Sequence, residues 1–308
     1  MNLNRRDFLH TTSFTAASLM LTPFESFAQP LLVPAAPGFS LKILATNWGF
    51  DGSMDAFCGK AKSDGYDGIE TVWPGDKQAQ DAIFSAVKKH GLEVAFLCRG
   101  DGADFTPHFN TFKQLTSAAA LQKTQKPLVI NCHSGKDYFT EEQNNQFIEF
   151  TTRLSKESGV LICHETHRSR MLFAAHISRK FIEKHQELNL TLDISHWCNV
   201  HETLLEDQPE TVALALSRTR HFHARVGHPE GPQVNDPRAP EWENVVKAHL
   251  AWWDVIVAEK KKSGTPLTVL TEFGPPDYMP TEPYTRKPLA DQWAVNVYMM
   301  QLLRKRYA

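Results

Sequence analysis

The chain has 308 residues, of which 42% are hydrophobic and 22% are charged, and its formal net charge is −2. This composition excludes a disordered or collagen-like chain and is sufficient for a full-sized hydrophobic core. The near-neutral charge gives no electrostatic basis for binding nucleic acid or an anionic membrane surface, so we expect neither as a partner.

The first 28 residues have the pattern of a signal peptide. The basic pair Arg5-Arg6 is followed by an apolar run through Leu21 and by the small-x-small pattern Ser26-Phe27-Ala28. The apolar run is shorter than the roughly 20 residues that a membrane-spanning helix needs, so no membrane span is expected. The paired arginines resemble a twin-arginine export signal, with a plain secretory signal or an apolar N-terminal helix as the alternatives. We therefore expect residues 1–28 to direct export to the periplasm and residues 29–308 to form one domain.

Eight short apolar runs, rich in Val, Ile and Leu, are predicted strands of the domain. Runs without strict alternation are typical of strands that are covered on both faces. The predicted strands are Leu41–Ala45, Gly68–Val72, Glu93–Cys98, Leu128–Cys132, Val160–His164, Leu190–Asp193, His221–Ala224 and Leu267–Thr271.

Longer amphipathic segments between the predicted strands indicate helices. They include Asp76–Lys89, Thr140–Ser158, Met171–His185, Trp242–Lys262 and Asp291–Arg304. Strands that alternate with helices predict a parallel sheet, and eight such pairs in one domain favour an α/β fold of the single (β/α)8 TIM-barrel type. The first predicted strand is not followed by a phosphate-binding GxGxxG sequence, which counts against a dinucleotide-binding fold.

The five cysteines include no close pair, and four of them lie at or near the ends of predicted strands. We expect them to be buried small side chains and not a disulfide framework, although one disulfide remains open.

Polar residues stand at the ends of the last four predicted strands. They are Glu165, Asp193, His223 and Glu272. In a TIM barrel the carboxyl ends of the strands converge on the active-site mouth, so these side chains are expected to lie close together. Three carboxylates in one place repel one another unless a cation lies between them. An oxygen-rich site with one imidazole suits Mn²⁺ best, with Mg²⁺, Co²⁺ or Zn²⁺ as alternatives; separate ion pairs with basic neighbours are the non-metal interpretation.

These strand ends resemble those of the xylose-isomerase-like sugar isomerase/epimerase superfamily. The resemblance lies in Glu165, Leu192-Asp193-x-x-His196, His221-x-His223-x-Arg225 and Glu272-Phe-Gly. It implies that Glu165, Asp193, His223 and Glu272 bind one divalent metal, with His223 and not His221 facing the barrel interior.

The resemblance also implies a reaction. A metal bound by adjacent carbonyl and hydroxyl oxygens of a keto-sugar acidifies the carbon between them, and a carboxylate removes its proton to form an enediolate. With Glu165 and Glu272 on opposite faces, proton return gives an epimer or isomer. Elimination of a group β to the carbonyl would instead make the protein an exported 3-keto-glycoside lyase.

Six further residues are expected to contact the sugar substrate. By the resemblance, His196 contacts the substrate or polarises one of its oxygens. Arg225 and His228 stand where related epimerases carry a different Gly-Glu-x-x-Arg sequence. The others follow strands: Glu70 and His133 end the second and fourth predicted strands, and Trp48 follows the first, where it could stack on a sugar ring.

Two other functions share this fold. An endonuclease IV-like phosphodiesterase would need a further Asp and His, suitably spaced, in the long polar loop Val226–Glu241, and no convincing pair is found there. A non-catalytic sugar-binding barrel is the second alternative. The sequence leaves the sugar, the reacting carbon, the metal and the formation of a homo-oligomer open.

Overall fold

The structure is a computed structural model, and it describes residues 27–307. The predicted signal peptide therefore lies almost wholly outside the described residues. Within residues 27–307, no helix combines the length and the apolar character that crossing a membrane requires.

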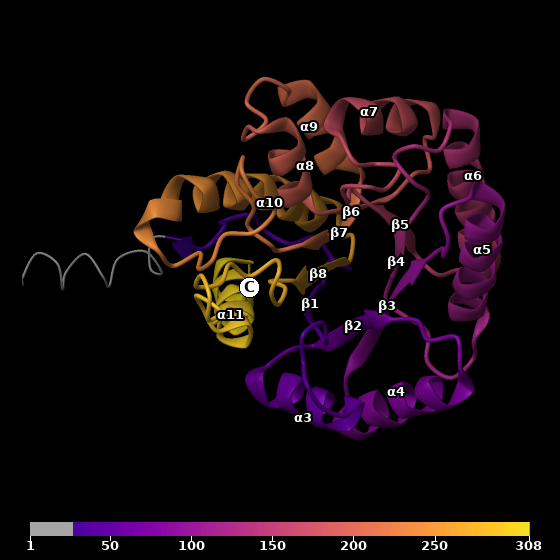
Figure 1. Ribbon diagram of the computed structural model, residues 1–308, viewed down its shortest axis with the longest axis horizontal. Helices are drawn as coiled ribbons and strands as arrows, with labels where there is room; N and C mark the ends of the chain where they lie inside the picture. The colour runs from indigo at the N-terminus through magenta and orange to yellow at the C-terminus, as the bar shows by residue number, and fades with distance from the viewer. Residues whose placement is uncertain (1–26, 308) are drawn as a thin grey trace, which may run out of the picture.

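The described chain is a closed barrel of eight parallel strands that are paired in sequence order, with β1 against β8 (Figure 1). The strands are β1 (Leu41–Thr46), β2 (Gly68–Val72), β3 (Glu93–Arg99), β4 (Ile130–His133), β5 (Ile162–Glu165), β6 (Leu190–Leu192), β7 (Thr219–His223) and β8 (Leu267–Thr271). The predicted (β/α)8 barrel is thus confirmed, with each predicted strand within two residues of its observed ends.

Helices follow every strand and surround the barrel (Figure 1). They are α3 (Met54–Asp64), α4 (Lys77–His90), α5 (Phe105–Leu121), α6 (Glu141–Ser158), α7 (Ala175–Lys184), α8 (Ile194–His201), α9 (Pro209–Arg218), α10 (Glu243–Ser263) and α11 (Gln292–Tyr307), with a 3-10 turn at Pro240–Trp242. Strand β6 is followed by two helices, α8 and α9, whereas the other strands are each followed by one α-helix.

Local sequence signals set several of these boundaries. The Thr140 side chain caps the first turn of α6 and Gln143 bonds back to the Thr140 backbone, which forms a complete capping box. Helix α6 ends at Gly159, whose φ of 67° is favourable only for glycine. Helix α7 begins at Ala175, four residues after the predicted start, because the backbone N–H of Met171 instead bonds the carbonyl of Ser134.

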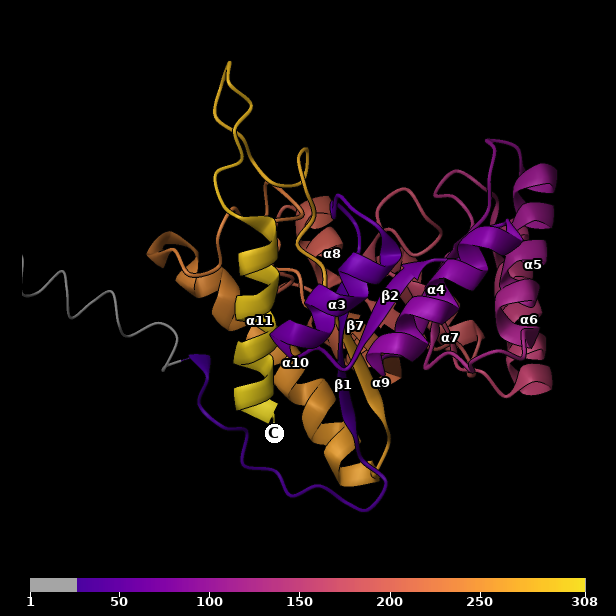
Figure 2. The ribbon, with the colours of Figure 1, turned by 90° about the horizontal axis from the view of Figure 1, so that it is seen from below.

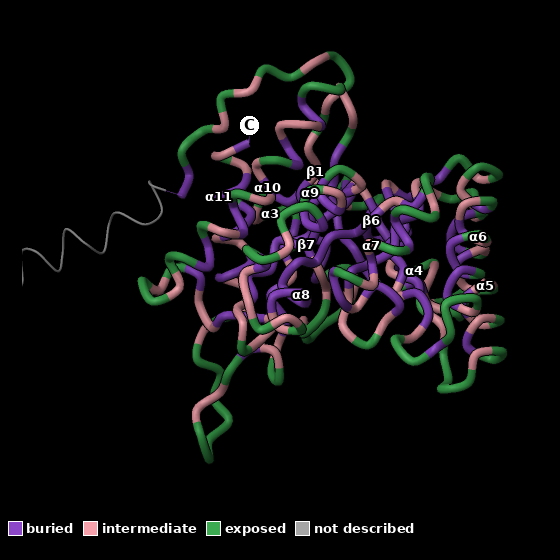
Figure 3. The backbone as a smooth tube through the Cα atoms, turned by 90° about the horizontal axis from the view of Figure 1, so that it is seen from above, coloured by how far each residue is buried: buried purple, intermediate pink, exposed green. Residues whose placement is uncertain are grey.

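The hydrophobic core lies mainly between the barrel and its helices, and Figure 3 shows buried backbone at the centre with exposed loops and helix faces outside. Phe222 of β7 illustrates this layer, because its ring stacks on Trp253 of α10 at a centroid distance of 5.6 Å. All five cysteines are free and buried, as expected.

The first described residues cross the amino-terminal end of the barrel and pack against the last helix (Figure 2). Arg306 donates from Nη1 to the carbonyl of Phe27 at 2.6 Å, and its own carbonyl accepts from the N–H of Leu31 at 2.8 Å. Arg306 is oriented by Asp254 of α10, at 2.7 Å from Nε. The loop between β8 and α11 projects from the opposite, carboxyl end of the barrel (Figure 2).

Candidate active site

Four side chains from adjacent strand ends converge at the carboxyl end of the barrel. Glu165 is the last residue of β5, Asp193 caps α8 directly after β6, His223 ends β7 and Glu272 follows β8. One donor atom from each of the four lies within 4.8 Å of the donor atoms of the others. Glu165, Asp193 and His223 are buried, and the Glu272 side chain is 13% exposed, so Glu272 is the most accessible carboxylate of the four.

His223 lies at the centre of this set. Its Nδ1 is 2.8 Å from Glu272 Oε2, 3.6 Å from Asp193 Oδ2 and 3.8 Å from Glu165 Oε1. Burial alone would lower the pKa of His223, but the carboxylates of Glu272 and Glu165 hold this pKa well above its usual value. Nδ1 is buried and has no hydrogen bond of good geometry among the described residues.

Asp193 uses its two oxygens for different purposes. Oδ1 accepts a hydrogen bond from the backbone N–H of Ser195 at 3.2 Å and thereby caps the start of α8. The same oxygen also accepts a hydrogen bond from the Ser195 hydroxyl. Oδ2 faces the site, where it forms an ion pair with Nη2 of Arg225. Burial opposes ionisation of Asp193, but Arg225 and His196 outweigh it and hold the pKa of this carboxyl far below its usual range.

Glu165 is held by two neighbours from β4. The Asn131 amide donates to Glu165 Oε2 at 2.6 Å, and Nε2 of His133 lies 2.9 Å from the same oxygen. Burial would raise the pKa of Glu165, but His133 and His223 lower it well below its usual value. The other oxygen, Oε1, remains directed toward His223.

Glu70 and His221 lie below the four residues, inside the barrel. Glu70 Oε2 is 3.0 Å from His221 Nε2, and Glu70 Oε1 is 3.8 Å from His223 Nε2. Burial disfavours the charge of Glu70, yet His221 and His223 lower its pKa to about 2. The prediction that only His223 of the histidine pair faces the interior is wrong, because residues two apart on a strand share one face, and both imidazoles contact Glu70.

The four converging residues suit a divalent cation. Three carboxylates and one imidazole form an oxygen-rich donor set, and the buried Nδ1 of His223 is directed at all three carboxylates without a good hydrogen bond. Arg225 already neutralises part of this charge, because Nη1 also lies 3.5 Å from Glu272 Oε2. The cation would therefore share Asp193 and Glu272 with a guanidinium group.

A cavity of about 430 Å³ opens above these residues, within the size range of small-molecule sites. Glu165 and Glu272 line it, and so do four of the predicted substrate contacts: Trp48, Glu70, His133 and Arg225. The cavity is also lined by residues that were not among the predicted contacts, including Asn47, Arg99, His167, Arg170 and Tyr278.

Two predicted substrate contacts do not line this cavity. His196 is fully buried, with Nε2 at 2.8 Å from Arg225 Nη2 and its ring centroid 4.0 Å from that of His167. His228 packs its ring on Trp242 at a centroid distance of 4.8 Å, and its backbone pairs with Gly231. His196 thus supports Arg225 from behind and His228 stabilises its own loop, and direct contact of these two residues with a substrate stays a prediction.

Tyr278 closes one side of the cavity from the loop after β8. The guanidinium of Arg225 lies 4.8 Å from its ring centroid and that of Arg168 lies 5.0 Å from it. Trp48 meets the same ring edge-on at 4.9 Å. These contacts hold two aromatic rings at the cavity wall, where the face of a sugar ring can pack.

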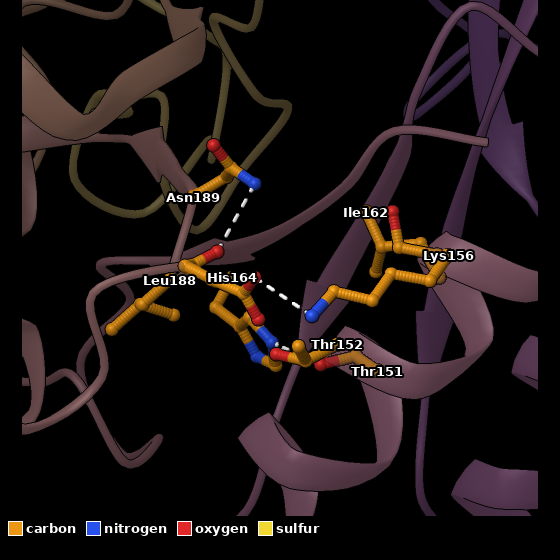
Figure 4. A pocket seen from close by; sticks show the side chains of 9 residues that line it. Thr151, Thr152, Lys156, Ile162, His164, Leu188 and Asn189 are labelled. Atoms are coloured by element: carbon orange, nitrogen blue, oxygen red, sulfur yellow. Dashed lines mark hydrogen bonds and ion pairs between the residues drawn. The ribbon is translucent and has the colours of Figure 1, made fainter. Parts of the chain in front are cut away.

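A second cavity of about 200 Å³ lies outside the barrel, between α6 and the β5–β6 region (Figure 4). His164 lines it, but Ser134 and Thr151 occupy its two ring nitrogens, each at 2.7 Å. Burial lowers the pKa of His164 to about 3, and Lys156 is paired with Glu187 at 2.7 Å. With these groups already bonded, the cavity offers no unused catalytic group.

The barrel and its buried acidic mouth define the class of protein. The chain belongs to the xylose isomerase-like TIM barrel family, whose model matches residues 58–245. No curated protein sequence matches the chain.

Solved structures share the fold at low sequence identity. The apo form of 3-keto-D-glucoside 4-epimerase from E. coli has a TM-score of 0.56 and 14% identity, over 86% of this chain and 99% of that chain. A D-tagatose 3-epimerase-like protein has a TM-score of 0.57 and 12% identity, over 85% of this chain and 97% of that chain. The probable 3-DHS dehydratase of petrobactin synthesis from Bacillus anthracis has a TM-score of 0.54 and 15% identity, over 86% and 99%.

Proposed function

We propose that this protein is a divalent-metal-dependent isomerase or epimerase that removes a proton next to the carbonyl group of a keto-sugar. The observation that carries the proposal is the convergence of Glu165, Asp193, His223 and Glu272 next to a cavity of about 430 Å³, which Glu165 and Glu272 line. The epimerases among the similar structures agree with it in fold.

The proposed cofactor is one metal ion, Mn²⁺ by preference, held by these four residues. When bound, it would supply Lewis acidity to the carbonyl and hydroxyl oxygens of the sugar. The carboxylates of Glu165 and Glu272 belong to strand ends on different sides of the site, and both line the cavity. Each can therefore hold a proton at a different face of the same sugar carbon, which is the requirement for epimerisation.

Other residues of this chain position and enclose the substrate. Arg225 keeps Asp193 ionised and stands beside Glu272, while Trp48 and Tyr278 provide apolar ring faces. His133 lines the cavity and contacts Glu165, so it can pass a proton between that carboxylate and the cavity.

The phosphodiesterase alternative has less support. Its additional metals would need ligands from the loop after β7, yet none of the candidate metal clusters among residues 27–307 includes a residue of that loop. Further His and carboxylate groups do surround the four residues, but they come from β2, β4, β7 and the loop after β5.

The deciding experiment is deuterium incorporation from D₂O into a panel of free ketoses and 3-keto-glycosides, with Mn²⁺ or with a chelator. We expect metal-dependent exchange that is lost in Glu272→Gln, while the exposed control Glu183→Gln keeps it. The labelled product separates an epimer from an elimination product and so tests the 3-keto-glycoside lyase alternative. Metal binding without exchange on any substrate would reject the proposal and favour a sugar-binding barrel.

We also propose, from the pattern of residues 1–28, that the protein is exported to the periplasm. Phe27 and Ala28, the last residues of the expected signal peptide, are 3% and 0% exposed in the described domain. Amino-terminal sequencing of protein from a periplasmic fraction tests both the export and the position of cleavage; recovery only in the cytoplasm would contradict export.

A further inference from the structure

Two guanidinium groups line the cavity without a carboxylate partner. Arg99 ends β3, and Arg170 follows β5 in the loop that leads to α7. Among residues 27–307, neither side chain forms an ion pair or a hydrogen bond, and Nε of Arg170 is buried without any partner. Arg170 is half-buried and its Nε is shielded from solvent, so this donor is costly unless a ligand satisfies it, whereas Arg99 is exposed and lines the cavity from its solvent side.

The other charged groups of the cavity have partners among the described residues, and Glu165 contacts His133 at 2.9 Å. Arg225 is paired with Asp193 and lies 3.5 Å from Glu272, and Glu70 is matched by His221. Arg99 and Arg170 therefore bring positive charge without an ion pair to the part of the cavity that β3 and β5 border, although the carboxylates of Glu165 and Asp137 also attract Arg170.

A third cation strengthens this charge. Lys136, in the loop after β4, is close enough to both arginines that they lower its pKa, although burial lowers it most. Burial likewise lowers the pKa of Arg170; the Glu165 carboxylate opposes this effect, and Arg99 adds to it. Lys136, too, forms no ion pair within the described part of the chain, so three neighbouring cations from consecutive strand ends share one region of the mouth.

The position of this charge relative to the candidate metal ligands defines a substrate shape. In the closed strand order, β3 to β5 lie across the barrel from β7, β8 and β1. A ligand that reaches from Glu272 after β8 to Arg99 after β3 must therefore span the cavity, and a volume of about 430 Å³ accommodates a monosaccharide with one substituent.

We propose that the substrate is an acidic sugar, whose carboxylate or phosphate is bound by Arg99 and Arg170 while its carbonyl end lies at the four converging residues. This proposal rests on the proposed function and names the substrate class of the same site. Guanidinium groups suit it because they bind carboxylate and phosphate oxygens through paired N–H donors.

Calorimetric titration with ligands that differ only at C6 tests the proposal without turnover. D-Glucose, D-glucuronate and D-glucose 6-phosphate are each titrated into the full chain in the presence of chelator. We expect at least one anionic sugar to bind on the order of tenfold more tightly than glucose, since a charge-assisted hydrogen bond contributes about that factor or more. The anionic sugar that binds more tightly shows whether the site prefers a carboxylate or a phosphate.

Arg99→Gln and Arg170→Gln should each remove this preference, whereas the control Arg179→Gln, on the exposed face of α7, should keep it. Arg170→Lys should restore part of it, because the charge returns without the paired donors. Equal binding of neutral and anionic sugars, no binding of either anion, or a preference that survives both Gln substitutions would overturn the proposal.

The outcomes separate this proposal from the one on which it rests. If the anions bind through Arg99 and Arg170 but no sugar exchanges deuterium, the anion site stands and the proton-abstraction chemistry fails. If neutral keto-sugars exchange deuterium and no anion preference exists, the chemistry stands and the acidic-sugar proposal fails.

Discussion

His223 Nδ1 and Glu272 Oε2 lie 2.8 Å apart, and this contact joins the end of β7 to the residue that follows β8. Because the carboxylates raise the pKa of His223, they favour a proton on this ring in the place that a metal ion would take. The contact therefore suggests a direct competition between a protonated and a metal-bound site.

We expect Mn²⁺ to raise the melting temperature of the wild-type chain. A ligand at a concentration 100 times its Kd stabilises the folded state by about 2.7 kcal/mol. Glu272→Gln should abolish most of this gain, because one of the ligand carboxylates is neutralised. Differential scanning fluorimetry with and without chelator measures the effect, and Glu183→Gln is the matched exposed control. A gain of equal size in Glu272→Gln would remove Glu272 from the ligand set.

Asn131 is expected to act on metal affinity through Glu165. Its amide donates to Glu165 at 2.6 Å and to Glu70 at 3.3 Å, and it is completely buried. Replacing a residue that orients a ligand typically lowers metal affinity roughly 10- to 100-fold. We expect Asn131→Ala to do so in a Mn²⁺ titration, and Asn131→Asp to be worse because it adds a third carboxylate between Glu70 and Glu165. An unchanged Kd in both variants would contradict this role.

Tyr278 should contribute to substrate binding through its ring and not through its hydroxyl. Both Arg168 and Arg225 lie against the ring face, and Trp48 packs on its edge. Tyr278→Phe keeps these contacts, so KM should stay close to that of the wild type. Tyr278→Leu should raise KM several-fold with a smaller change in kcat, a pattern that steady-state kinetics on any exchanged substrate can distinguish. A loss confined to kcat in Tyr278→Phe would instead assign the hydroxyl to proton transfer.

The chain should lose stability in acid through His249. This residue is fully buried on α10, where Nδ1 donates to Val245 O at 2.9 Å and Nε2 accepts from the N–H of Gly227 at 3.2 Å. Burial lowers its pKa from 6.5 to about 4. The unfolded chain therefore binds a proton at this imidazole more readily than the folded chain does. The contribution of the neutral imidazole to the free energy of unfolding is present above pH 6.5 and is lost as the pH falls toward 4. This contribution is on the order of 3 kcal/mol.

Urea unfolding across this pH range tests the assignment. His249→Gln should be less stable than the wild type at pH 7, but its stability should fall less steeply between pH 6.5 and pH 4. The exposed control His176→Gln should keep the wild-type slope. A slope that is unchanged in His249→Gln would mean that this imidazole does not carry the acid sensitivity.

The strand ends could be predicted from the sequence because a parallel barrel imposes a simple rule. Residues that follow buried apolar runs must meet at one end, and Glu165, Asp193, His223 and Glu272 do lie together there. The rule needs no knowledge of loop conformation. The rule does not predict how deeply a side chain lies, since His196 belongs to the first turn of a helix that places it behind Arg225 and away from the cavity.

The rest of the cavity wall could not be predicted, for two reasons. Arg170 and Tyr278 lie in loops whose paths depend on tertiary packing, and neither belongs to a periodic pattern. The strand-end rule does reach Arg99, which ends β3, but that strand was predicted to stop one residue earlier, at Cys98. His221 was misplaced by applying strand alternation to residues two apart, for which alternation predicts the same face.

The pairing of β1 with β8 has a consequence for how the protein acquires this site. Leu41 to Ala45 pair with Leu267 to Thr271, so the ring of hydrogen bonds closes only between the two ends of the described chain. Such distant pairing carries a large loop-closure entropy, which slows the late steps of folding. Because Glu272 directly follows β8, the candidate ligand set is completed only when this last strand has joined the barrel beside β7. The ability to bind metal would therefore report on the last stage of folding, after most helices have already formed.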